Sequence, residues 1–255
     1  MALQSSGNLT VGSINAEATG SGPGGDIALQ VSGNLTTEGS FNAGGNGVAL
    51  SSSSAGGPAG NITLDSGGAV NLSSGRVRAI STNAPAGNIT VTAGGDITTG
   101  AGAAPFAAVA AFPAAGGSGT GGNIQFTSAG GNINTSAGDV DAGTPSGNAG
   151  AIALQASGTL TTGNVSASSL GGSGGQIELI GESVALQGNI LAVGQNGSGG
   201  NITATTAGNL TGTGLISASA IASGNGGEVA LQGSTITLQG RYGPKVLVGK
   251  GAKFP

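Results

Sequence analysis

The chain has no histidine, no cysteine and no tryptophan, and only 6% of its 255 residues are charged. The absence of histidine and cysteine excludes imidazole acid–base catalysis, thiol nucleophiles and the usual zinc sites. Globular domains carry about 25% charged residues, so the ionisable groups on which most enzymes rely are scarce here. We therefore expect no enzymatic activity and no cofactor.

Charge of either sign is sparse, and the net charge is −4. Only Arg76 and Arg78 are basic before residue 241, and strand alternation predicts that both face outward. Because nucleic-acid binding needs a concentration of basic residues, we expect no nucleic-acid partner. No run of about 18 apolar residues is present, so we expect no membrane insertion. The first residues show no charged and apolar leader, so no signal peptide is predicted.

Glycine, by contrast, is abundant, with 56 residues, and it recurs in a repeated pattern. Each copy begins with a glycine and a small or polar residue. Three residues follow, of which the first and the third are apolar. The first apolar residue of each copy is an anchor, and the anchors are Ile27, Ile62, Ile89, Ile124, Ile152, Ile177, Ile202 and Val229. Their spacings are 35, 27, 35, 28, 25, 25 and 27 residues, and residues 1–4 align with 27–30 as a ninth copy. Repeats of this period indicate a stacked solenoid or a propeller.

Each copy contains further short segments in which apolar and polar residues alternate. A second triplet lies at residues 9–11, 35–37, 70–72, 97–99, 133–135, 160–162, 184–186, 210–212 and 236–238. A third lies at 14–16, 41–43, 77–79, 140–142, 165–167, 190–192 and 216–218. Alternation of this kind between Gly, Ser and Asn turns predicts three short strands per copy. A propeller blade needs about 40 residues for four strands, so the shorter repeat favours a solenoid.

The predicted fold is all-β, a right-handed parallel β-helix (β-solenoid) of about nine triangular coils with three short strands each. Residues 1–240 would form the shaft, and the basic segment 241–255 a C-terminal tail or cap. Anchors stack along the axis at the strand spacing of about 4.8 Å, which gives a rod of roughly 40 Å. We expect the glycines to supply positive φ angles and close backbone approach at the corners.

Two copies are longer than the others, with predicted loop insertions near 44–59 and 101–121. The second insertion contains Phe106 and Phe112, which form either an exposed interaction loop or a cover over an edge of their own coil. A different surface is predicted on the second strand, where alternation turns one threonine outward in six copies. This outward column consists of Thr10, Thr36, Thr98, Thr161, Thr211 and Thr237.

The acidic residues and asparagines have simpler interpretations. Asp139 and Asp141 are close in sequence and alternate onto one face, but two carboxylates fall short of the six or more oxygens that calcium takes. We therefore expect a solvated turn and no metal site. Asn-X-Ser/Thr sequences recur along the chain, and asparagine as a turn residue before a threonine-rich strand is favoured over glycosylation.

The elements Gly-Asn-Ile-Thr-Leu (60–64), Gly-Gly-Asp-Ile-Thr-Thr-Gly (94–100) and Ser-Gly-Asn-Leu-Thr-Thr (32–37) resemble the repeat shafts of filamentous-haemagglutinin-like exoproteins. The resemblance covers residues 1–240. It implies a large fibre of a Gram-negative-type bacterium, secreted by the two-partner route or held at the outer cell surface, and used for adhesion or biofilm contact. The Asn-Pro-Asn motifs of that family's secretion domain are absent from this chain.

Three hypotheses about function follow. The first is a structural shaft of a secreted or cell-surface fibre that binds a host surface or glycan. The second is self-association through the ends of the β-helix, because an uncapped coil exposes unpaired backbone amides. The third is ice binding by the outward threonine column.

Overall fold

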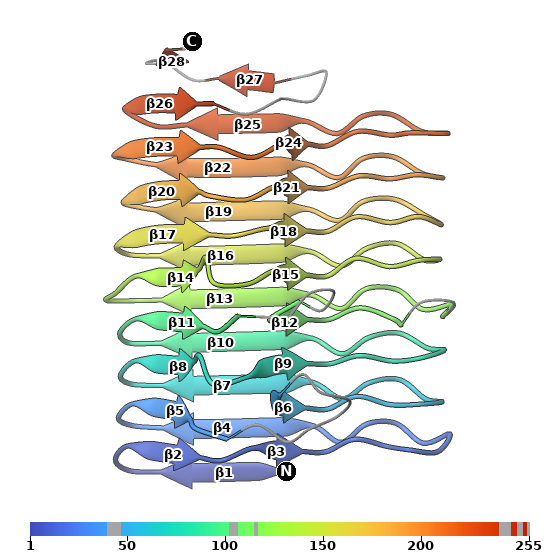
Figure 1. The fold of residues 1–255 in the computed structure, drawn as a ribbon, viewed down its shortest axis with the longest axis vertical. Coiled ribbons are helices and arrows are strands. Elements are labelled where there is room, and N and C mark those ends of the chain that lie inside the picture. Colours follow the sequence, from blue (N-terminus) through green and yellow to red (C-terminus); the bar gives the residue numbers. More distant parts are fainter. Residues whose placement is uncertain (40–46, 102–106, 115–116, 240–245, 249–251, 254–255) are drawn as a thin grey trace.

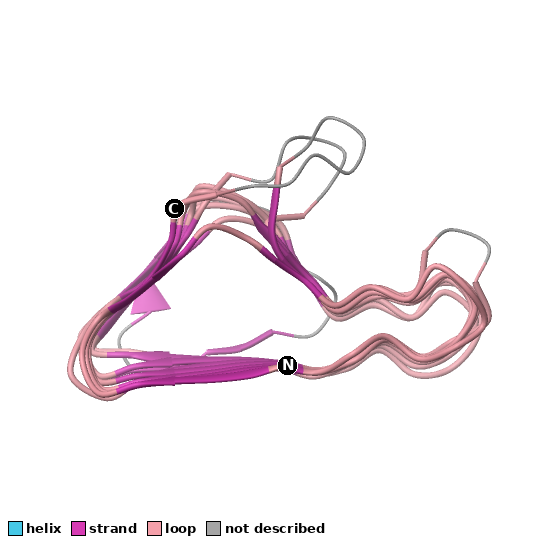
Figure 2. Cartoon of the chain, turned by 90° about the horizontal axis from the view of Figure 1, so that it is seen from below, coloured by secondary structure: helices cyan, strands magenta, loops and turns pink. Residues whose placement is uncertain are grey.

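The computed structural model describes residues 1–39, 47–101, 107–114, 117–239, 246–248 and 252–253. Within these residues all regular secondary structure is β-strand, and the strands form three parallel sheets. The chain passes from one sheet to the next, so each coil adds one strand to each sheet (Figure 1). Seen along the axis, the sheets enclose a triangle, and a long loop projects from one corner (Figure 2). The predicted parallel β-helix with three strands per coil is confirmed.

The first sheet contains ten strands and runs the length of the rod. Most of its strands have five residues, of which the first, third and fifth are buried. Its order is β1 (Ala2–Ser5), β4 (Ile27–Val31), β7 (Ile62–Ser66), β10 (Ile89–Ala93), β13 (Ile124–Ser128), β16 (Ile152–Ala156), β19 (Ile177–Gly181), β22 (Ile202–Thr206), β25 (Val229–Gln232) and β27 (Val246–Val248).

The second sheet also has ten strands, and the third has eight. The second is β2 (Leu9–Val11), β5 (Leu35–Thr37), β8 (Val70–Leu72), β11 (Ile97–Thr99), β14 (Ile133–Thr135), β17 (Thr159–Thr162), β20 (Ser183–Leu186), β23 (Asn209–Gly212), β26 (Thr235–Leu238) and β28 (Ala252–Lys253). The third is β3 (Ile14–Asn15), β6 (Val48–Ser51), β9 (Arg76–Arg78), β12 (Val109–Ala110), β15 (Val140–Asp141), β18 (Val165–Ser166), β21 (Ile190–Leu191) and β24 (Ile216–Ser217). Eight coils therefore contribute a described strand to all three sheets.

The anchors predicted from the repeat are in register from coil to coil. Ile62 pairs with Ile27 on one side and with Ile89 on the other, and the series continues to Val229. In the first coil Leu3 pairs with Leu29, which confirms the alignment of residues 1–4 with 27–30. Because side chains alternate along a strand, this register directs every anchor into the triangle.

Inward side chains from all three sheets form one hydrophobic core along the rod. Phe126 of β13 is the largest fully buried side chain in this core. In the first coil Leu3, Leu9 and Val11 are only partly buried and pack against the core from its end. Each coil therefore depends on its neighbours to bury its apolar face, as in other solenoids.

The third strand of the second coil lies elsewhere than the sequence predicts. Residues 41–43 fall outside the described residues, and the strand is β6, in which Leu50 pairs with Ile14 and with Val77. The register shifts between Val48 and Leu50. In the longer fourth coil, residues 109–110 form β12 between β9 and β15. The segments 44–59 and 101–121 each contain a buried core strand, so the prediction that they are loop insertions was wrong at these residues.

Two further predictions concern the glycines and the tail. Among the described residues Gly224 is the only glycine with positive φ, at 87°, so the prediction of left-handed corners is wrong. The described parts of the tail are β27, which pairs with β25, and β28, which pairs with β26. They extend the first two sheets by one strand each.

Candidate functional site

A loop that we call the arm projects from the triangle in each coil, between the third strand and the first strand of the next coil (Figure 2). A hydrogen bond closes the base of each arm. In the first arm the Gly25 N–H donates to the Ala16 carbonyl at 2.8 Å, and the same bond joins Gly175 to Ala167 at 2.7 Å. Arms of successive coils also bond to each other, as from the Ala55 N–H to the Ala18 carbonyl. The arms therefore stack into a ribbon beside the triangular rod.

The third sheet and the arm ribbon meet at an angle, and a cavity of about 290 Å³ lies in this corner over the first three coils. Its lining is mixed, with hydroxyl groups, two charged residues and small apolar groups. The lining residues are Glu17, Ala18, Thr19, Ser53, Ser54, Ala55, Arg78, Ile80 and Thr82. We call this corner the groove.

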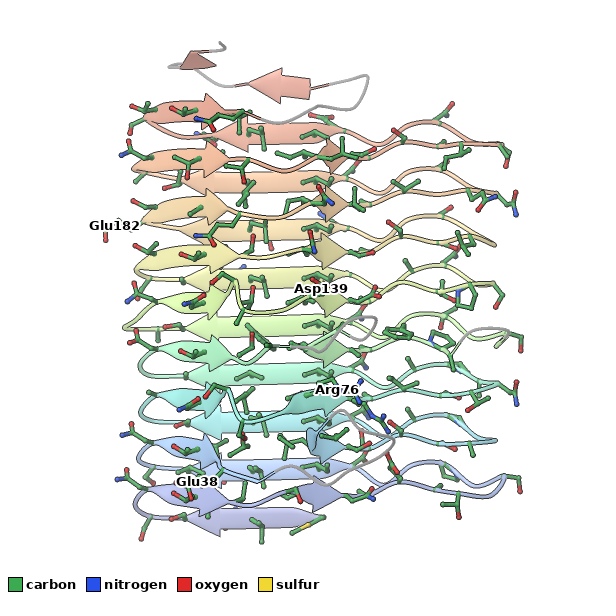
Figure 3. All side chains as sticks on the ribbon, viewed as in Figure 1. Glu38, Arg76, Asp139 and Glu182 are labelled. Carbon is green, nitrogen blue, oxygen red and sulfur yellow. The ribbon has the colours of Figure 1, made fainter. Side chains whose placement is uncertain are left out.

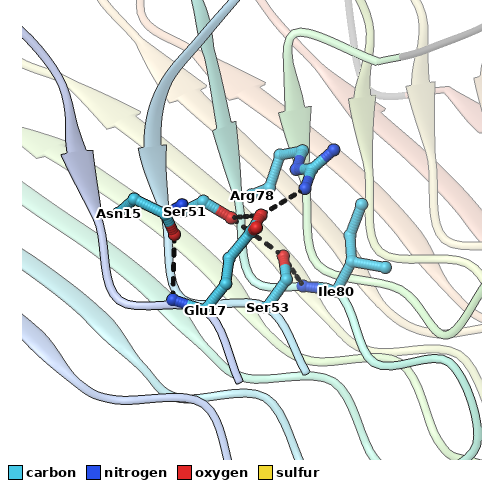
Figure 4. A network of polar contacts seen from close by, with 6 residues as sticks. All are labelled: Asn15, Glu17, Ser51, Ser53, Arg78 and Ile80. Atoms are coloured by element: carbon cyan, nitrogen blue, oxygen red, sulfur yellow. Dashed lines mark hydrogen bonds and ion pairs between the residues drawn. The ribbon is translucent and has the colours of Figure 1, made fainter. Parts of the chain in front are cut away.

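A polar network lies at the inner wall of the groove (Figure 4). Glu17 Oε1 accepts hydrogen bonds from Arg78 Nη2 at 2.5 Å and from the Ser51 hydroxyl at 2.6 Å. Ser51 and Ser53 share a hydrogen bond of 3.1 Å between their hydroxyls, and the Ile80 N–H donates to Ser53 Oγ. Glu17, Ser51 and Arg78 come from three successive coils, so the network crosses the strand-to-strand boundaries of the rod.

No local pattern predicts this pair, because Glu17 and Arg78 are 61 positions apart. The signal that could have revealed it is the register. Asn15, Ser51 and Arg78 occupy one outward row of the third sheet, and Glu17 lies two residues beyond that row. Aligning all three copies would have placed opposite charges in neighbouring positions.

The two phenylalanines proposed for an interaction loop have different outcomes. Phe106 lies outside the described residues. Phe112 follows β12 and is half-buried. Its neighbour Pro113 bridges to Ser81 of the preceding coil, so Phe112 occupies the position equivalent to Ile80. It therefore continues the row that lines the groove.

Arg76 and Asp141 lie in the third sheet and are less exposed than the sequence suggests. Strand alternation predicts that Arg76 faces outward, and the structure adds that this residue is covered, since it is only 3% exposed. Burial lowers the pKa of Arg76, and the positive charge of Arg78 lowers it further. Figure 3 shows Arg76 beside the third sheet.

Asp141 is half-buried, and the expectation of a solvated turn does not hold for it. Burial raises the pKa of Asp141. The Gly143 N–H opposes this effect, Asp139 adds to it by repulsion, and a hydrogen bond from Ser166 opposes it. Asp139 itself accepts a hydrogen bond from the Asn164 side chain at 2.9 Å. Among the described residues, no three His, Cys, Asp or Glu side chains form a cluster that could hold a metal ion.

The threonines of the predicted outward column lie in one row of the second sheet. Thr10 pairs with Thr36, and Thr211 pairs with Thr237. In successive coils the row is Thr10, Thr36, Asn71, Thr98, Asn134, Thr161, Ala185, Thr211 and Thr237. All six threonine side chains are exposed or half-buried. The column is therefore aligned, with three interruptions.

Asparagine side chains form ladders at the turns, which the sequence did not predict. The Asn61 N–H donates to Asp26 Oδ1 at 2.7 Å, and Asn61 Oδ1 in turn accepts the Asn88 N–H at 2.9 Å. A second ladder before the second strand links Asn8 to Asn34 at 2.8 Å. These side chains bond to the backbone of the neighbouring coil, so they hold coils in register as well as shaping turns.

Comparison with known proteins finds no relative of this chain. No protein-family model, no curated protein and no solved structure matches the chain. In the part of the chain that the structure describes, no helix is long and apolar enough to cross a membrane. A function must therefore be inferred from the rod, its surface and the groove.

Proposed function

We propose that this chain is a structural shaft of a secreted or cell-surface fibre, which makes adhesive or biofilm contacts and performs no catalysis. The observation that carries the proposal is the unbroken parallel register of the first and second sheets, each of ten strands. At a strand spacing of about 4.8 Å this stack forms a rod of roughly 40 Å. Such a rod separates whatever it carries at one end from whatever anchors it at the other.

The outer surface supports the same proposal. Outward positions of the first sheet are mostly occupied by small or polar residues, among them Gln30, Thr92 and Gln125, which are exposed, with Ile180 as an exception. The ladders of Asn61 and its equivalents lie at the corners. A polar surface with in-register hydrogen bonds keeps the rod soluble along its length while the core holds it straight. The repeat resemblance to filamentous-haemagglutinin-like shafts, and thus to a bacterial surface fibre, belongs to this proposal.

The proposal is tested by location and by shape. Fractionation of the source cells, with an antibody to the chain, should find the protein at the outer surface or in the culture medium. Electron microscopy of the purified chain should show rods, and beads coated with it should adhere to cells or glass more than beads coated with the unfolded chain. A protein confined to the cytosol, or coated beads that adhere no better than controls, would contradict the proposal.

The aligned threonine row favours one alternative, an ice-binding surface. Parallel strands place Thr10 and Thr36, and then Thr211 and Thr237, at the regular spacing of a β-sheet. Against it, Asn71 and Asn134 turn their side chains to local backbone, accepting the N–H groups of Ser73 and Ser136. Thermal hysteresis at millimolar protein, lost on replacing Thr36 by leucine, would favour this alternative. Ice growth unaffected by the chain would eliminate it.

A further inference from the structure

The Glu17–Arg78 pair belongs to one place in the rod and is not a feature of the repeat. In the row that contains Arg78, later coils have Ala110, Asp141, Ser166 and Leu191. The two side chains are only 22% and 18% exposed, for Glu17 and Arg78 respectively. Withdrawing two charges from water is costly, and a pair of this kind often stabilises less than apolar packing would. A charged pair that the other coils do without therefore points to a role beyond holding coils together.

The network leaves donors and acceptors available at the groove. Within the described residues, both contacts to the Glu17 carboxylate are made to Oε1, which leaves Oε2 able to accept. Arg78 reaches Glu17 through Nη2. Its guanidinium has five N–H donors, of which the one on Nε is buried, so the donors open to a ligand are those of the two Nη atoms. Thr19 and Thr82, which are both exposed, add hydroxyls to the same lining. An acceptor and several donors thus lie side by side in a hollow.

The charges in the groove exclude two ligand classes. An anion would meet the carboxylate of Glu17 next to Arg78, and a cation would find a single carboxylate whose charge Arg78 already neutralises. The lining mixes charged and hydroxyl groups with the apolar side chains of Ala18, Ala55 and Ile80, so a wholly apolar ligand would leave polar groups without partners. A neutral ligand with many hydroxyl groups remains, because each hydroxyl both donates and accepts.

We propose that the groove over the first three coils binds a neutral saccharide, with Glu17 and Arg78 bonding its ring hydroxyls and Ile80 contacting its C–H face. The cavity of about 290 Å³ is near the lower end of the range of small-molecule sites, about 300–1,000 Å³, which suits one or two sugar rings. The inference deepens the proposed adhesive function by assigning a chemical class to its ligand. A shallow site of this size predicts dissociation constants near the millimolar range, so a fibre with many copies would bind by avidity.

The test is saturation-transfer NMR on the whole chain with glucose, galactose, mannose, N-acetylglucosamine and lactose, and with sialic acid and inorganic sulfate as anionic probes. At least one neutral sugar should bind, and its affinity should fall at least about tenfold in Glu17→Gln and in Arg78→Met, because hydrogen bonds to charged groups are the stronger ones. Glu182→Gln is the control with the same charge change. Glu182 projects into solvent from another corner of the rod (Figure 3), and its variant should bind like the parent.

Ala55→Trp gives a second test that leaves the ion pair intact. Ala55 is exposed at the edge of the cavity, so the indole should cover the hollow and abolish sugar binding without lowering the melting temperature. Binding that survives in Ala55→Trp or in Glu17→Gln, preference for sialic acid or sulfate, or no neutral sugar bound at 50 mM (a ceiling of about 1.8 kcal/mol of binding free energy) would each overturn the inference. Rods seen by electron microscopy in the same preparation would show that the shaft proposal stands even so.

Discussion

A β-carbon on Gly87 would lie 1.9 Å from the carbonyl oxygen of Gly60, the glycine at the same position one coil earlier. The same relationship repeats along the rod. In each later coil an added β-carbon would lie about 2 Å from the carbonyl oxygen of the equivalent glycine in the preceding coil. This holds at Gly122, Gly150, Gly175, Gly200 and Gly227. Because these obstacles are backbone atoms, no side chain can move aside. Glycine is required here by close approach between coils, not by its φ angle.

Gly87→Ala should therefore destabilise the rod by at least about 2 kcal/mol, because overpacking forces backbone shifts. Urea unfolding followed by circular dichroism measures the change. Gly20→Ala is the matched control, since nothing lies within 4 Å of its added β-carbon, and its effect should stay within about 0.5 kcal/mol. Equal stability of the two variants would show that the arms can separate without cost.

Asn61→Ala should lower the free energy of unfolding by about 1–2 kcal/mol, because it leaves the Asn88 N–H without its side-chain acceptor. Asn61→Asp should restore only part of this loss, because its carboxylate can accept the Asn88 N–H but replaces the Asn61 Nδ2 donor, which lies 3.3 Å from Asp26 Oδ1, by a like charge. Asn83→Ala provides a control at an exposed asparagine. If Asn61→Ala and Asn83→Ala unfold at the same urea concentration, the ladder does not stabilise the rod.

Asp141→Asn should stabilise the protein at pH 7. Burial, the largest cause, raises the folded-state pKa of Asp141 above its ordinary value of 3.8. Between those two values the folded state binds more protons than the unfolded state, so stability falls as pH rises through this window. Asparagine does not titrate, so the variant lacks this pH dependence of stability. Its gain in stability over the parent should shrink towards zero as the pH falls below about 4. Melting temperatures from pH 3 to 8 measure this, and a gain that grows in acid would contradict the assignment.

The isolated 255-residue chain should associate end to end. β1 pairs only with β4 among the described strands, so its other edge has unpaired backbone groups, and half-buried Leu3 lies at the same end of the core. Light scattering should show a mass that rises with concentration. Leu3→Lys should suppress the rise by placing a charge at the edge, whereas Gln125→Lys, in the middle of the rod, should not. A mass of one chain at every concentration would contradict this prediction.

The repeat predicted most of the fold because packing and sequence agree in the first two strands of each coil. Ile62, Ile89 and Ile124 each lie two residues after a glycine and alternate with polar residues. In a narrow triangle only one register buries all of these isoleucines. The third strands have as few as two residues, so local pattern is weak there. In the second coil, residues 41–43 and Val48–Ser51 both fit the pattern, and pairing with Ile14 decides for the latter.

The groove was harder to predict because its parts come from different coils. Strand alternation predicts the outward row of Arg78, but neither its partner Glu17 nor the hollow between sheet and arm has a local sequence signal. Arg76 shows the same limit, since strand alternation gives the direction of a side chain but not whether neighbouring coils cover it. Phe112, by contrast, has a local signal, since phenylalanine is scarce and this one lies in a longer copy of the repeat, and the residue lies in the row that continues the groove.

The winding of the chain has a mechanical consequence. Each described strand pairs only with strands of the coils on either side of it, so a force that pulls the two chain ends apart acts on the outermost strands first. Coils should then peel away one at a time, each releasing the 25–35 residues of one repeat. At about 3.5 Å per extended residue, every step would lengthen the molecule by roughly 90–120 Å. A fibre built this way would lengthen under flow in steps of one coil. It would shorten again as the coils refold.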